Sequence, residues 1–78
     1  MKANKIVTVQ DLTLNKPTAE IKGVAYNWAT NKANIQILFK EEGSINGHER
    51  SLEMDTNGEE VTAAQVNAFI KNELKDFE

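Results

Sequence analysis

The chain has 78 residues, a formal net charge of −3, one histidine and no cysteine. This composition excludes disulfides, thiolate metal sites and a multi-histidine metal site within one subunit. The length allows one domain, 1–78, whose small core requires unusually good packing or association with a partner. We therefore expect a homo-oligomer or a component of a larger protein complex.

Charge is divided unevenly along the chain. Residues 1–40 carry six lysines against two acidic residues, whereas residues 41–78 carry three basic residues against ten acidic ones. The two halves could match head to tail between subunits, although scattered surface charge is the commoner interpretation. Because the lysines form no concentrated basic stripe, we expect no nucleic-acid partner.

The first residues, MKANKIVTV, lack the apolar stretch of a signal peptide. No run approaches the roughly 20 apolar residues that span a bilayer. These features predict a protein of the cytoplasm, or of a particle assembled in the cytoplasm, with no membrane partner.

Two strands are expected over residues 5–14 and 19–29, and both break their apolar alternation. In the first strand, two valines lie on one face and two leucines on the other. Paired across a loop at 15–18, the two strands change apolar face at the same level. Either a bulge at Gly23 restores a single apolar face, or the hairpin tip presents its apolar residues away from the core. The residues concerned are Leu12, Leu14, Ala19 and Ile21.

The third strand is expected over residues 33–43, where apolar side chains occupy every second position from Ala33 to Phe39. A turn at Asn31–Lys32 would place the large side chains of the second strand opposite them. The expected pairs are Trp28 with Ile35, Tyr26 with Ile37 and Val24 with Phe39.

The fourth strand is expected over residues 48–55. It follows Asn46–Gly47, and an asparagine–glycine pair is the strongest short hairpin signal because both turn residues need positive φ. This turn would set Phe39 opposite Met54 and Glu41 opposite Leu52.

A helix is expected over residues 62–77. Thr62 and Gln65 have the spacing of a capping box, and Val61 and Val66 that of a hydrophobic staple. An apolar stripe at helical spacing follows, and it should cover the sheet face that carries Tyr26 and Trp28. The predicted fold class is α+β: a two-layer β4α domain with a four-stranded antiparallel meander packed on one C-terminal helix.

No stretch predicts a metal or cofactor site. Residues 53–65 resemble part of an EF-hand calcium loop, with Asp55, Asn57 and Gly58 in register. However, Ala64 stands where the bidentate glutamate is required, and a strand rather than a helix precedes the loop. We interpret the segment as a polar turn.

No set of reactive groups converges in the sequence. Strand alternation places His48 and Arg50 on one face and Glu49 on the other, at an exposed hairpin end. Tyr26 and Trp28 are interpreted as core residues rather than a stacking platform, because the helix should cover them. We predict no catalytic residue and no enzymatic activity.

The predicted function is that of a non-enzymatic structural or assembly module. It would self-associate or dock onto a larger protein assembly, and a small phage virion or other particle component would suit this profile. The alternative is a small acidic monomeric inhibitor or regulator that binds a basic protein partner. The predicted protein-contact residues lie in the first hairpin and in the arm 41–50: Leu12, Leu14, Ile21, Ile45, His48 and Arg50.

Overall fold

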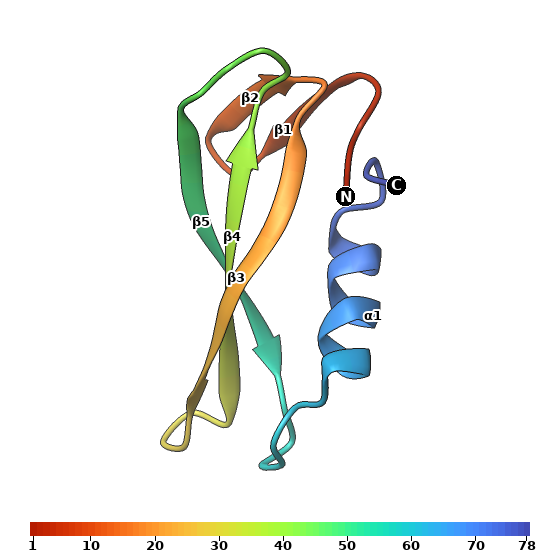
Figure 1. Cartoon of the computed structure of the whole chain (residues 1–78). Coiled ribbons are helices and arrows are strands. Elements are labelled where there is room, and N and C mark those ends of the chain that lie inside the picture. Colours follow the sequence, from red (N-terminus) through yellow and green to blue (C-terminus); the bar gives the residue numbers. More distant parts are fainter.

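The structure is a computed structural model that describes residues 1–78. Its elements are β1 (Ile6–Val9), β2 (Leu12–Asn15), β3 (Thr18–Asn27), β4 (Lys32–Lys40), β5 (Gly47–Asp55) and α1 (Ala63–Glu73). β3, β4 and β5 form a three-stranded antiparallel sheet, while β1 and β2 form a separate two-stranded sheet (Figure 1). The α+β class with antiparallel strands and one C-terminal helix is confirmed, whereas the single four-stranded meander is wrong.

The first predicted strand is two strands because the chain reverses at Gln10–Asp11. Gln10 adopts a left-handed φ of 53°. The resulting hairpin pairs Val7 with Leu14 and Val9 with Leu12, so the valines and leucines share one face. The break in alternation therefore marks a tight turn at Gln10–Asp11. The first reversal of the chain comes before the loop that the sequence predicted at 15–18.

A second break, in β3, is a bulge. The pairing with β4 shifts between Ile21 and Gly23, which leaves Lys22 as the extra residue. The bulge returns the apolar residues on both sides of it to one face of the sheet. Of the two alternatives that the sequence left open, the bulge is correct and the outward-facing apolar tip is wrong, since Leu14 is only 3% exposed.

Both predicted registers of the three-stranded sheet are displaced. Ile35 lies opposite Val24 rather than Trp28, because a four-residue turn at 28–31 joins β3 to β4. Phe39 lies opposite His48 rather than Met54, because the loop before β5 spans residues 41–46. Each displacement is an even number of residues, so the predicted faces of the side chains are retained.

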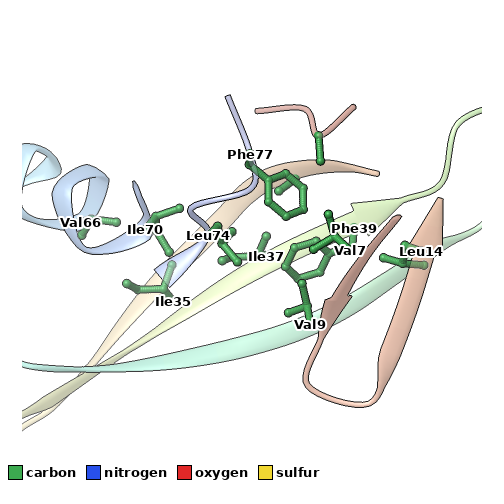
Figure 2. Packing of buried hydrophobic residues seen from close by; sticks show 12 residues of the cluster. Val7, Val9, Leu14, Ile35, Ile37, Phe39, Val66, Ile70, Leu74 and Phe77 are labelled. Carbon is green, nitrogen blue, oxygen red and sulfur yellow. The ribbon is translucent and has the colours of Figure 1, made fainter. Parts of the chain in front are cut away.

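The core lies between one face of the three-stranded sheet and a second layer. β4 contributes Ala33, Ile35, Ile37 and Phe39, which are fully buried as the alternation predicted. The second layer consists of α1 and the β1–β2 hairpin. Figure 2 shows the helix residues towards one end of the apolar cluster, the hairpin residues towards the other, and Phe77 beside Phe39 between them.

Short backbone ladders close the domain around the two chain ends. Lys2 and Glu78 exchange both backbone hydrogen bonds, at 3.1 and 2.8 Å, and the Ala19 N–H donates to the Met1 carbonyl at 2.9 Å. Lys5 also pairs with Asp76 at 2.8 Å. These contacts fix the two termini side by side, as Figure 1 shows.

The predicted capping box of α1 is confirmed. The Gln65 N–H donates to the Thr62 side chain at 3.2 Å, and the Thr62 N–H donates to the Gln65 side chain at 2.8 Å. The helix ends at Glu73, earlier than the predicted residue 77, and Leu74 and Phe77 are buried beyond it.

A matched pair of isoleucines tests the position of the core. Ile37 is fully buried and Ile6 is 67% exposed, although both lie on strands. We expect Ile37→Ala to lower the free energy of unfolding by about 2–5 kcal/mol, because it removes buried methyl groups and leaves a cavity. Ile6→Ala should change it by about 0.5 kcal/mol or less. Urea denaturation followed by circular dichroism measures both, and equal losses would contradict the layer assignment.

Candidate functional site: an apolar groove beside the β3 edge

The predicted contact residues lie in two different environments. Leu14 is buried in the core, and Leu12 and Ile21 pack against it while partly exposed. Ile45, at 92% exposure, lies in the 41–46 loop, and His48 is exposed at the start of β5. The structure therefore separates these residues rather than gathering them. Their role in protein contact stays a prediction.

Arg50 is occupied by a contact within the chain. Its guanidinium binds the Asp11 carboxylate through two hydrogen bonds, of 2.9 and 3.2 Å, and its Nη1 donates to the Glu49 carbonyl. Next to it, the Gln10 side chain donates to the Ser51 carbonyl at 3.0 Å. The turn of the β1–β2 hairpin is thus fastened to the edge strand β5.

The Asp11–Arg50 pair controls the ionisation of the carboxyl group. The hydrogen bond from Arg50 is the main cause that holds the pKa of Asp11 below its ordinary value of 3.8, and the nearby His48 adds a smaller electrostatic contribution. At the far end of the sheet, Lys32 pairs with Glu53 and Asp55, each at 3.2 Å, and these hydrogen bonds raise the pKa of Lys32. These charged groups therefore form ion pairs within the chain, on its surface.

The segment that resembles a calcium loop is a polar turn between β5 and α1, as predicted. Thr56 is buried, and both its N–H and its hydroxyl donate to the Asn31 carbonyl, at 3.1 and 2.8 Å. Asn57 and Gly58 adopt positive φ, which the reversal requires. No group of three or more histidine, cysteine, aspartate or glutamate side chains is placed to hold a metal ion. The helix α1 has neither the length nor the apolar character that a membrane-spanning helix requires.

The largest concave surface is an apolar groove between β3 and the start of α1. Its volume is about 550 Å³. Seven of the ten residues that line it are hydrophobic. The ten lining residues are Ile21, Val24, Tyr26, Trp28, Glu60, Val61, Thr62, Ala63, Val66 and Asn67. A smaller hollow of about 330 Å³ continues along β3 towards Met1 and shares Ile21 and Asn67 with the groove.

The groove exposes side chains that were predicted to be core. Trp28 is 74% exposed and Val24 is 43% exposed. The Trp28 ring meets the ring of Tyr26 edge to face, with 5.0 Å between centroids. The prediction that the helix covers Trp28 is therefore wrong, whereas Tyr26 is half-buried. Trp28 falls in the 28–31 turn, which projects beyond the first turn of α1 in Figure 1.

A difference in length between helix and strand leaves these residues uncovered. α1 has 11 residues and spans about 16 Å, whereas the ten residues of β3 span about 33 Å. The helix places Val66 and Ile70 in the core with β4, and the β1–β2 hairpin covers the other end of the sheet. A comparison of element lengths is the sequence signal that could have revealed the groove.

The edge of β3 beside the groove is unpaired. The N-terminal segment pairs only with the start of the strand, at Thr18 and Ala19. From Gly23 to Asn27 the backbone makes hydrogen bonds only in the ladder with β4. An open strand edge next to apolar side chains can accept another extended polypeptide, because main-chain hydrogen bonds and side-chain contacts form together.

The chain matches no protein-family model, no curated protein sequence and no solved structure. The groove and the β3 edge are therefore interpreted from their own geometry.

The Asp11–Arg50 contact predicts a pH-dependent contribution to stability. Because the pKa of Asp11 is lowered on folding, this contribution is fully present above the ordinary value of 3.8 and is lost as the pH falls through the folded-state pKa. Asp11→Asn should therefore lower the urea midpoint at neutral pH but not at strongly acidic pH. Glu49→Gln, on the opposite face of β5, is the charge-matched control. A difference between wild type and Asp11→Asn that persists unchanged in acid would contradict the pairing.

Proposed function

We propose that the chain is a non-enzymatic structural or assembly module that contacts protein through the β3–α1 groove. It would either self-associate or dock onto a larger protein assembly, and a small phage virion or other particle component remains the setting that suits it. The observation that carries this proposal is the exposure of Trp28 and Val24 beside an unpaired strand edge. Apolar clusters of this kind on small domains mark contact surfaces.

The shape of the molecule supports an associating protein. The accessible surface is 5201 Å², compared with about 4,700 Å² expected for a compact monomer of this mass. The radius of gyration is 13.0 Å, compared with about 11.5 Å for a compact domain of this length. The excess surface agrees with an incompletely covered sheet.

The surface proposed for contact differs from the one expected from sequence. The predicted contact residues Leu12, Leu14 and Ile21 pack into the core or against it, so they offer little free surface. The groove takes their place as the leading contact surface. Ile45, in the 41–46 loop, is the exposed apolar residue of the predicted arm.

An acidic inhibitor or regulator is the second candidate. Glu60 lines the groove, and Glu59 is the residue before it in the chain. Neither carboxylate forms an ion pair. These charges would attract a basic residue on a protein partner. Binding of this kind should weaken steeply as salt concentration rises, whereas binding dominated by the apolar groove should not.

The size of the protein in an extract of its native source tests the proposal. We expect wild-type protein to elute well above the 8.7 kDa of a monomer, and Val24→Asp to elute as a monomer, because a carboxylate in the groove opposes burial. Ile6→Asp, at an exposed position of β1, is the matched control and should elute like wild type. Circular dichroism checks that each variant folds.

Two results would contradict the proposal. A wild-type protein that elutes as a monomer from the native extract would exclude assembly. A shift caused by Ile45→Asp, with none caused by Val24→Asp, would transfer the contact from the groove to the arm.

A further inference from the structure

We infer that the groove is occupied by a second copy of this chain, joined edge to edge along β3. Two three-stranded sheets would then form one six-stranded antiparallel sheet. This inference rests on the proposed function and names its partner. It is carried by the difference between the two sheet edges, the length of the open stretch, and the side chains along it.

The two edges of the sheet differ in how they are protected. On β5, the Gln10 and Arg50 side chains bind the carbonyls of Ser51 and Glu49, and charged residues follow one another along the strand. On β3, the stretch Gly23–Asn27 has no charged residue and no such covering bond. Charged side chains and covering groups are the usual protection of an edge, so β3 is the edge left open to pairing.

The open stretch fixes the register of the pairing. It begins after the bulge at Lys22 and ends before the turn at Trp28, which leaves the five residues 23–27. An antiparallel two-fold pairing that uses all five must place Ala25 opposite Ala25 of the second copy. Val24 of one copy then faces Tyr26 of the other, and Gly23 faces Asn27. Such a pairing is self-complementary and closes as a dimer.

The side chains suit this arrangement on both faces of the sheet. On the outer face, Gly23 and Ala25 are small and leave the edge accessible. On the inner face, Val24 and Tyr26 of both copies would meet, and pairs of aromatic and β-branched residues stabilise a sheet. The two α1 helices would flank the seam, so that each groove becomes a wall of a shared apolar core. This removes from water the side chains that one chain leaves exposed.

The charged residues next to the open stretch do not block this pairing. Lys22, just beyond one end of the stretch, pairs with Glu20 of its own chain at 3.3 Å. The seam itself therefore consists of uncharged side chains. A second copy supplies the apolar residues that the groove would bind.

A cysteine at the proposed axis tests the pairing, because the chain has no cysteine of its own. Opposed residues of an antiparallel pair have Cα atoms about 4.5–5.5 Å apart, which lies within the disulfide range of about 4.4–6.8 Å. We expect purified Ala25→Cys, under mild oxidation, to form a covalent dimer of twice the 8.7 kDa monomer mass. Ser51→Cys, at an exposed position on the β5 edge, is the control and should stay monomeric on a non-reducing gel.

Light scattering of the purified cysteine-free chain provides a second readout. We expect a dimer at high protein concentration that Val24→Asp dissociates. A purified chain that stays monomeric, together with no cross-linking at Ala25→Cys beyond that at Ser51→Cys, would overturn the second-copy inference. If the native extract still contained a large species sensitive to Val24→Asp, the groove would bind a different protein and the proposed function would stand. A monomer both in the purified preparation and in the native extract would overturn the second-copy inference and the proposed function.

Discussion

The structure depends on one constraint: a short second layer must cover one face of a long sheet. The buried residues of β4, from Ala33 to Phe39, run along the middle of that face. The helix packs against one end of this row and the β1–β2 hairpin against the other. The rings of Phe77 and Phe39 pack where the helix and the hairpin meet, with 6.0 Å between their centroids. This junction also holds the chain ends, through the backbone ladder between Lys2 and Glu78. Core packing, hairpin placement and closure of the termini therefore all depend on this apolar row of β4.

The same constraint explains the surface that is left open. Where neither cover reaches, the inner face of β3 ends in exposed apolar side chains, and its edge remains unpaired. The other edge is treated differently, because the Asp11–Arg50 contact fastens the hairpin turn across β5. The β5 edge is thus in contact with the hairpin turn of the same chain, and the β3 edge is available to a partner. A protein with so small a core gains stability when such a surface is buried by association.

Sequence reasoning succeeded where local side-chain chemistry decides the structure. The alternation in β4 and the capping box at Thr62 predicted their elements, because burial and helix capping act over a few residues. It failed where pairing partners are chosen over longer distances. The two-residue turn at Gln10 has no glycine to signal it, and the loop before β5 overrode the Asn46–Gly47 hairpin signal. The groove was missed because Trp28 was predicted to lie under the helix only from the face of the strand that it shares with Tyr26. The lengths of the helix and the strand were not compared.

We propose that the β3 edge, which is open in a single chain, is covered by a partner. Amide hydrogen exchange, resolved by residue at increasing protein concentration, tests it most directly. We expect the outward-facing amides within 23–27 to exchange freely at low concentration and to become protected at high concentration, while those of the β5 edge do not change. Exchange within 23–27 that is independent of concentration, or protection that rises equally at both edges, would contradict it.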